Sequence, residues 1–258
     1  MKQGDFTELA KHYGNRPAYS ERILNAILKI QDFEKKQDFR VVEIGAGTGK
    51  LTRMLLEMGL NVLAVEPNDE MRVEGEKYTA DLNPEASGWQ KGSGEETGIE
   101  TGAADWAVMA SSFHWTDPNR SLPEIARILK PGGHFTAIWN PRNIEASEFH
   151  MRIERKIYEI APNISRVSSG SKKHTQDWAQ VLTSTAHFQD VLFMECDHIE
   201  KWLPSRYLGA WESVNDIQAQ AGPEKWQAIL SMIKEEIAEL DFVETPYKMR
   251  AWTARKVS

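Results

Sequence analysis

One stretch of the chain, residues 43–49, combines a carboxylate with three glycines at alternate positions: Glu43-Ile44-Gly45-Ala46-Gly47-Thr48-Gly49. Glycine turns sharply and, because it lacks a Cβ, lets the backbone approach a ligand closely. The apolar residues Val41 and Val42 precede the stretch, and apolar side chains at helical spacing follow it. A buried strand, a glycine turn and a helix start present backbone N–H groups to a ligand.

Three kinds of nucleotide site use a glycine loop of this form. A phosphate-cradling loop, G-x-x-x-x-G-K-[ST], fails twice, because Ile44 replaces its first glycine and Leu51 its Ser or Thr. The dinucleotide fingerprint, G-x-G-x-x-G, needs a glycine where the chain has Lys50, so that interpretation is weakened but stays open. Residues 43–49 match the third pattern, E/D-x-G-x-G-x-G, in full.

This third pattern resembles the loop of the class I S-adenosylmethionine-dependent methyltransferases. The resemblance implies that the methionine end of the cofactor is held by Glu43, Gly45, Ala46, Gly47, Thr48 and Gly49. In the family an acidic residue ends the second strand and takes the ribose hydroxyls. Residues 61–67 resemble that strand, and Glu66 falls 21 residues after Gly45. A carboxylate accepts hydrogen bonds from two vicinal hydroxyls at once. Pro67 and Met71 belong to the same predicted site.

Further segments extend this resemblance around the cofactor. Residues 89–97 resemble the end of the family's third strand, so adenine is expected beside Ser93, Gly94 and Glu95; many relatives carry Asp in place of Ser93. Ala110 and Ser111, at the end of a fourth strand, are expected near the methionine amino group. The pattern Tyr-x-x-Arg-Pro-x-Tyr is similar to an N-terminal lid in the subgroup of trans-aconitate methyltransferase-like enzymes, which adds Tyr13, Arg16 and Tyr19. Tyrosine faces stabilise cations such as a sulfonium.

The acceptor side is predicted from the ends of the fourth and fifth strands. Methyl transfer is an in-line displacement that requires an aligned acceptor and exclusion of water. His114 is the candidate general base, with packing in the wall as its alternative. The candidate substrate contacts are His114, Trp115, Trp139, Asn140 and Arg142. A small carboxylic acid fits a clamp by Arg16, Arg142 or Arg206, since arginine matches carboxylate geometry; an amine or heterocycle fits an aromatic pocket equally well.

These residues require alternating strands and helices to position them. The pattern predicts strands such as 105–110 and helices such as 20–30. The resemblance implies an α/β fold, a doubly wound seven-stranded Rossmann-like sheet with the last strand antiparallel, plus a helical cap. The expected division is a helical lid over 1–35, a cofactor-binding core over 36–142, and the remaining sheet with its inserted cap over 143–258, all in one compact unit.

Composition and charge exclude several classes of function. The net charge is −7 and no dense Lys/Arg stripe is present, which argues against nucleic acid as a partner. Cys196 is the only cysteine, so an intrachain disulfide and a thiolate metal cluster are excluded, and no His/Asp/Glu spacing indicates a metal site. The chain has no apolar run long enough to cross a membrane and no secretory signal at its start, so a cytoplasmic location is expected.

The sequence therefore predicts an S-adenosylmethionine-dependent methyltransferase that acts on an O or N atom of a small-molecule acceptor. Methyltransferases of nucleic-acid bases carry an [Asp/Asn]-Pro-Pro-[Tyr/Phe] motif, whereas this chain has Ser111-Ser112-Phe113-His114 at that place. One alternative is an NAD(P)-dependent oxidoreductase, although no Tyr-x-x-x-Lys pair is present. Another is a non-catalytic S-adenosylmethionine-binding protein. The oligomeric state stays open.

Overall fold

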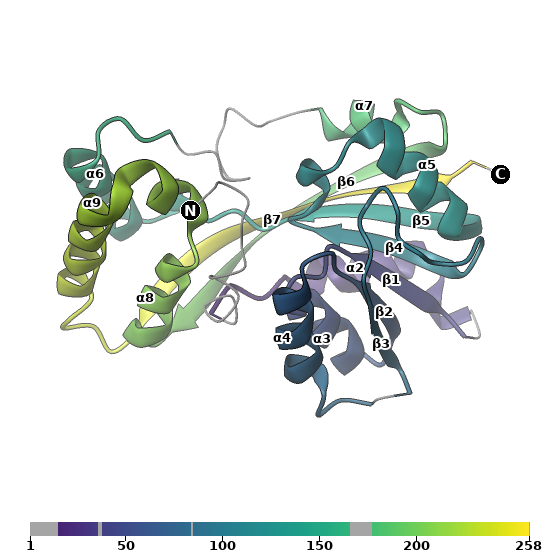
Figure 1. The fold of residues 1–258 in the computed structure, drawn as a ribbon, viewed down its shortest axis with the longest axis horizontal. Helices are drawn as coiled ribbons and strands as arrows, with labels where there is room; N and C mark the ends of the chain where they lie inside the picture. Colours follow the sequence, from purple (N-terminus) through teal and green to yellow (C-terminus); the bar gives the residue numbers. More distant parts are fainter. Residues whose placement is uncertain (1–14, 36–37, 84, 166–176, 258) are drawn as a thin grey trace. The chain divides into compact units, whose positions relative to one another are not determined.

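The computed structural model describes residues 15–35, 38–83, 85–165 and 177–257 (Figure 1). The described residues divide into two compact units. The larger unit contains residues 18–35, 38–83, 85–139, 177–196 and 249–257, and the smaller unit contains residues 15–17, 140–165 and 197–248. The expected division at residues 35 and 142 stays a prediction. None of the described helices has the length and apolarity needed to cross a membrane.

A seven-stranded sheet runs in the order β3-β2-β1-β4-β5-β7-β6. Its strands are β1 (Arg40–Ile44), β2 (Asn61–Val65), β3 (Ser87–Gln90), β4 (Ala104–Ala110), β5 (Leu129–Trp139), β6 (Phe188–Trp202) and β7 (Val243–Lys256). Strands β1 to β5 pair in parallel, and β7 runs antiparallel to β5. The predicted doubly wound, Rossmann-like sheet with an antiparallel last strand is confirmed.

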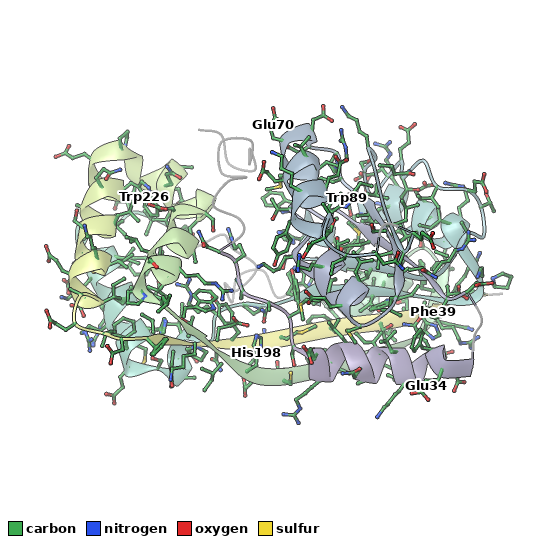
Figure 2. The ribbon with its side chains drawn as sticks, turned by 90° about the horizontal axis from the view of Figure 1, so that it is seen from below. Glu34, Phe39, Glu70, Trp89, His198 and Trp226 are labelled. Atoms are coloured by element: carbon green, nitrogen blue, oxygen red, sulfur yellow. The ribbon has the colours of Figure 1, made fainter. Side chains whose placement is uncertain are left out.

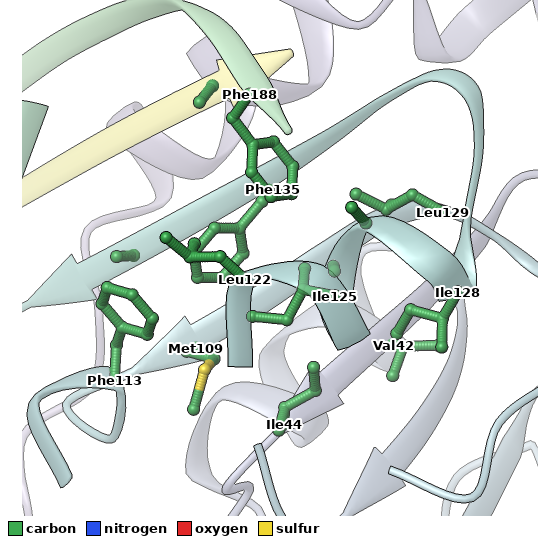
Figure 3. Packing of buried hydrophobic residues seen from close by; sticks show 14 of the residues in the cluster. Val42, Ile44, Met109, Phe113, Leu122, Ile125, Ile128, Leu129, Phe135 and Phe188 are labelled. Atoms are coloured by element: carbon green, nitrogen blue, oxygen red, sulfur yellow. The ribbon is translucent and has the colours of Figure 1, made fainter. Parts of the chain in front are cut away.

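Helices cover both faces of the sheet in the larger unit. They are α2 (Glu21–Ile30), α3 (Lys50–Glu57), α4 (Asp69–Thr79), α5 (Pro118–Ile128) and α7 (Trp178–Thr183), with short 3-10 turns η2 (Phe33–Lys35) and η3 (Phe113–Trp115). Alternate strand residues point to opposite faces. Val42 and Ile44 accordingly pack in one buried cluster with Leu122 of α5 (Figure 3), while Val41 packs in another with Leu24 of α2.

The helix at residues 21–30 belongs to the core of the larger unit. Its apolar face buries Ile23, Leu24, Ile27 and Leu28 against residues of β1 and β2. The apolar face that predicted the helix is therefore the face that packs on the sheet.

Strand β5 follows helix α5 directly: the helix ends at Ile128 and the strand begins at Leu129. Leu129 pairs with Ala104 and His134 with Trp106, so a register irregularity absorbs the intervening residues.

The smaller unit is built on the helices α6 (Glu148–Ile160), α8 (Pro204–Glu212) and α9 (Asn215–Glu236), with the 3-10 turn η4 (Ile144–Ala146). Ser147 caps α6 by accepting a hydrogen bond from the His150 N–H. Helix α9 is kinked at Gly222, directly before Pro223. Apolar residues of these helices, including Trp226 (Figure 2), form a separate buried cluster.

Candidate cofactor and acceptor site

The glycine loop connects β1 to α3 at the carboxyl end of the sheet. Gly45, Gly47 and Gly49 have φ values of +70°, +58° and +77°. The N–H groups of Gly45 and Ala46 donate to the carbonyl of Val65 at 2.8 and 3.1 Å, which ties the loop to the end of β2. Because β1 lies between β2 and β4, the loop stands where the strand order reverses, the usual ligand position in such sheets.

The glycines differ in what surrounds them. A Cβ at Gly45 would lie 2.6 Å from the Ser112 Cβ, and one at Gly49 would lie 3.0 Å from the Trp89 ring. At Gly47 the nearest atom would be the Met71 Sδ, at an ordinary 3.8 Å. Two glycines therefore allow the loop to pack against the protein itself, and Gly47 leaves its side open to a ligand. The sequence had not assigned Ser112 or Trp89 to the site; the adjacent Ser111 was the only local signal.

Glu66 follows β2 and is buried, with 6% of its surface exposed. Its Oε2 accepts the Gly47 N–H at 2.8 Å, and its Oε1 accepts the Asn68 N–H at 2.9 Å. Burial raises the pKa of this carboxyl, and the two backbone N–H groups act in the opposite direction. Each carboxylate oxygen has a second lone pair for a further donor. The side chain is thus held rigidly beside the loop with acceptor capacity for two hydroxyls.

Glu43 at the start of the motif is also buried, and its Oε2 accepts the Thr52 hydroxyl of α3 at 2.5 Å. Burial raises the pKa of Glu43 to about 8; the Thr52 hydrogen bond lowers it and the nearby Glu66 raises it further. The carboxyl is therefore largely protonated at neutral pH and holds β1 to α3. Its predicted contact with the methionine end of the cofactor stays a prediction.

The pKa of Glu43 gives a testable pH dependence of stability. Its raised pKa means that the folded state holds a proton which the unfolded state loses above about pH 4.5. Its contribution is fully present below pH 4.5 and is lost as pH rises to about 8. Each pKa unit is worth about 1.4 kcal/mol, so the loss is on the order of 5 kcal/mol. We expect the free energy of unfolding of Glu43→Gln, relative to that of wild type, to be higher at pH 8 than at pH 5. Denaturant unfolding at the two pH values measures this difference. An unchanged difference would show that Glu43 ionises normally.

The loop after β3 is joined to the segment after β4. The Ser93 Oγ accepts the N–H groups of Glu95 and Glu96 and so closes its own turn. Glu95 accepts the Asp117 N–H at 2.9 Å, and a Cβ at Gly94 would lie 2.6 Å from Thr116. These contacts place Ser93, Gly94 and Glu95 on one edge of the sheet with the residues that follow β4. Their predicted contact with adenine stays a prediction.

The end of β4 has an unusual backbone conformation. Ser111, which follows the buried Ala110, has a φ of +56°, which non-glycine residues rarely adopt, and its N–H donates to the Ile138 carbonyl at 2.7 Å. Ser112 donates its hydroxyl to the Ile44 carbonyl at 2.9 Å. Such conformations concentrate at functional sites because the surrounding structure must enforce them.

An aromatic group adjoins this turn. The Trp139 indole N–H donates to the His114 Nδ1 at 3.1 Å, and the His114 and Trp115 rings lie 4.9 Å apart. Trp139 is buried and stacks on Trp178 at 4.3 Å, whereas Trp115 is 57% exposed. The structure thus brings together three of the predicted acceptor contacts. Trp178, which starts α7, was missed because no sequence pattern linked it to β5.

The remaining predicted residues are placed as follows. Tyr19 is partly buried in the larger unit, and its N–H donates to the Met54 Sδ at 3.3 Å. Arg16 belongs to the smaller unit and donates to the Ser213 carbonyl at 2.7 Å. Asn140 and Arg142 also belong to the smaller unit.

Three further predicted residues lie at the edges of the loop region. Thr48 and Met71 are buried, Pro67 is exposed, and Met71 donates its N–H to the cap residue Asn68. Tyr13 lies outside the described residues. The described part of the chain contains no group of three His, Cys, Asp or Glu side chains suited to a metal ion.

Comparison with known proteins identifies the segment around the loop. Residues 42–137 match the methyltransferase domain family model. Over 108 residues the chain is 41% identical to an uncharacterized methyltransferase of Mycobacterium tuberculosis, a match that covers 40% of this chain and 41% of that protein. A Saccharomyces cerevisiae protein assigned as an S-adenosylmethionine-dependent methyltransferase is 29% identical over 131 residues, covering 50% of this chain and 44% of that protein. The matches thus span about half or less of these relatives' length.

Solved structures share the fold over nearly the whole chain. A protein of Anaeromyxobacter dehalogenans, assigned as a type II methyltransferase, superposes with a TM-score of 0.62 at 18% identity, covering 93% of this chain and 97% of that one. Phosphoethanolamine N-methyltransferase 2 of Haemonchus contortus does so with a TM-score of 0.56 at 16% identity, covering 100% of this chain and 59% of that one. Residues 42–137 therefore match a methyltransferase domain, in agreement with the family predicted from the glycine loop, and the fold of the chain is shared with solved methyltransferases.

Proposed function

We propose that the protein transfers a methyl group from S-adenosylmethionine to an O or N atom of a small molecule by in-line displacement. The observation that carries the proposal is the pairing of the glycine loop with Glu66. Both oxygens of this buried carboxylate accept backbone N–H groups, one of them from Gly47 in the loop. The small-molecule acceptor and the cytoplasmic location stay predictions.

The residues of the larger unit fit an adenosyl ligand. The backbone at Gly47 is open on the side where a Cβ would stand, and Glu66 has acceptor capacity for vicinal hydroxyls. The loop glycines would hold the methionine end and Glu66 the ribose. When bound, the cofactor supplies an electrophilic methyl group on a sulfonium centre. The protein's own task is to align the acceptor with it and to exclude water.

A small acceptor is supported by the residues after β4. The turn η3 carries Phe113, His114 and Trp115 in place of the Pro-Pro motif of base methyltransferases. Trp139 and Trp178, which are both buried, stack on each other and contact His114 and Phe113 of this turn. Such walls suit a small organic molecule with few polar groups. The net charge of −7 disfavours nucleic acid as the acceptor.

The hydrogen bond from Trp139 defines the chemistry open to His114. The indole donates to Nδ1, so Nδ1 uses its lone pair and a neutral ring carries its proton on Nε2. A ring in this state donates from Nε2 and has no lone pair there to take a proton. We therefore propose that His114 positions the acceptor as a hydrogen-bond donor, in place of the predicted role as general base.

Paired substitutions distinguish the two roles of His114. Glutamine retains an N–H donor but is not a base, so we expect His114→Gln to keep turnover within about tenfold of wild type and His114→Leu to lose about 100-fold. The measurement is steady-state turnover across pH with the acceptor identified in the screen described next. Equal losses in both variants, with disappearance of the same pH limb, would restore the general-base role.

Binding and turnover test the proposed function in sequence. Calorimetric titrations with S-adenosylmethionine, S-adenosylhomocysteine and NAD(P)H run in parallel, and we expect saturable binding of the two adenosyl ligands alone. Methyl-labelled cofactor is then incubated with a panel of small acids and amines, and label is sought in the small-molecule fraction. Binding of NAD(P)H without a response to the adenosyl ligands would overturn the proposal.

A further inference from the structure

The side chain of Glu124 joins helix α5 to the loop between β3 and β4. Its Oε1 accepts hydrogen bonds from both the N–H and the hydroxyl of Thr97, at 2.9 and 2.5 Å. Thr97 is fully buried, and only 13% of the Glu124 side chain is exposed. Hydrogen bonds to a charged carboxylate are among the stronger ones in proteins. Glu124 therefore holds the middle of this loop on α5.

Arg127, one helical turn further on, holds the Glu124 carboxylate in place. It donates from Nε to Glu124 Oε2 at 2.7 Å and from Nη2 to Oε1 at 2.8 Å, in a two-point arrangement. The same guanidinium donates to the Ile99 carbonyl at 2.8 Å and to the Thr101 hydroxyl at 3.0 Å. The hydrogen bond from Arg127 is the largest cause that lowers the pKa of Glu124 to about 2, so this carboxylate is charged at neutral pH.

Thr97 is also bonded to the end of β3. Its carbonyl accepts the side-chain N–H of Gln90 at 2.7 Å. The Gln90 carbonyl in turn accepts the Glu66 N–H at 3.1 Å. A Cβ at Gly92 would lie 2.5 Å from the Thr97 carbonyl oxygen, so the chain passes this residue closely. A continuous set of hydrogen bonds thus leads from Glu124 through Thr97 to the backbone of the proposed ribose residue.

A second attachment to α5 lies earlier in the same loop. The Glu95 carboxylate accepts the N–H of Asp117, the cap residue at the start of α5, and Gly94 packs on Thr116. Glu124 lies in the middle of the helix, which spans Pro118–Ile128. The segment 93–97 is therefore attached to α5 at two points, and loss of the Glu124 attachment frees one of them.

We propose that Glu124 is a positioning residue for the cofactor, because through Thr97 it fixes the segment 93–95 in the conformation that recognises the purine base. The inference rests on the proposed function and on the expected position of adenine beside this segment. Glu124 acts through the loop and not by contact with the base. Recognition requires polar groups held within about 0.5 Å of their productive positions, and a segment fixed beforehand loses less entropy when the ligand binds.

The direct test compares two ligands that differ only in the purine base, S-adenosylhomocysteine and S-inosylhomocysteine. Calorimetry with the full-length protein gives the dissociation constant of each. We expect wild type to bind the adenosyl ligand at least about tenfold more tightly than the inosyl ligand. In Glu124→Ala we expect the adenosyl affinity to fall about tenfold and the preference to shrink to about threefold or less. A purely structural role of Glu124 would lower the melting temperature and leave the preference unchanged.

Two further variants show whether Glu124 acts through Thr97, and they keep the test valid if Glu124→Ala does not fold. Thr97→Val retains the shape of the side chain but removes the hydroxyl that donates to Glu124, so the preference should also shrink. The double variant Thr97→Val/Glu124→Ala should lose no more than Glu124→Ala alone. Glu124→Gln keeps an acceptor for Thr97 and should retain a preference within about threefold of wild type.

Glu236→Ala is the matched control. The Glu236 side chain is 15% exposed and forms ion pairs with Arg152 and Lys156, but it belongs to the smaller unit. Its base preference should equal that of wild type. An unchanged preference in folded Glu124→Ala, an equal loss in Glu236→Ala, or a wild type that binds both ligands equally would overturn this inference alone. Failure of wild type to bind either ligand would overturn the proposed function as well.

Discussion

Replacing Glu66 with alanine is expected to reduce the affinity for S-adenosylhomocysteine by about 100-fold or more. The change removes the proposed acceptor of two ribose hydroxyls, worth about 1.5–3 kcal/mol each before compensation by water. It also removes the acceptor for the Gly47 and Asn68 N–H groups, so the loop loses one of its links to the end of β2. Calorimetry measures the loss.

The design separates the ribose contact from damage to the loop. Glu70→Ala is the matched control, because this glutamate is exposed in the first turn of α4 (Figure 2). It should bind as wild type does. In wild type, a 2′-deoxy analogue of the ligand should bind more weakly than the parent ligand. In Glu66→Ala, the analogue and the parent ligand should bind with the same affinity. A full penalty for the analogue in Glu66→Ala would place the ribose elsewhere.

The second large effect is expected from Gly45→Ala. Its new Cβ would lie 2.6 Å from the Ser112 Cβ and 2.8 Å from the Ser112 Oγ, at a φ of +70°. Left-handed backbone costs about 1–2 kcal/mol for a non-glycine residue, and overlap in a packed site about 1–3 kcal/mol more. We therefore expect cofactor affinity to fall about 30-fold or more, with a lower melting temperature.

Two further variants isolate the steric overlap from backbone strain. Gly59 has a φ of +81° and nothing within 4 Å of a new Cβ, so Gly59→Ala carries the strain alone. It should lose stability modestly and retain cofactor affinity. Ser112→Gly removes both overlapping atoms and should partly restore binding to Gly45→Ala, despite the loss of its hydrogen bond to Ile44. If the double variant binds no better than the single one, Ser112 is not the obstacle.

The sequence predicted elements whose signals are local. Helix α4 begins at Asp69 after the cap residue Asn68, as its residue types indicate. The strand–glycine loop–helix segment and the carboxylate after β2 were identifiable because spacing along the chain alone defines them. The arrangement of the sheet was predicted from the family resemblance that these segments carry.

Features that depend on partners distant in sequence were not predictable. Trp178 stacks on Trp139 across 39 positions of the chain, and Ser112 contacts Gly45 across 67. The assignment of α2 to the larger unit also depends on contacts rather than on its own pattern. His114 illustrates the same limit, because its hydrogen bond from Trp139, and not its residue type, determines which ring nitrogen has a lone pair.

The position of β7 has a consequence for synthesis on the ribosome. This strand is the last in the chain, yet in the sheet it lies between β5 and β6. A nascent chain that has emerged only as far as β6 leaves one side of β5 with unpaired N–H and C=O groups, an edge prone to pairing with other chains. The sheet is completed when β7 inserts between two existing strands. This side of β5 therefore stays open to pairing until residues 243–256 have emerged from the ribosome.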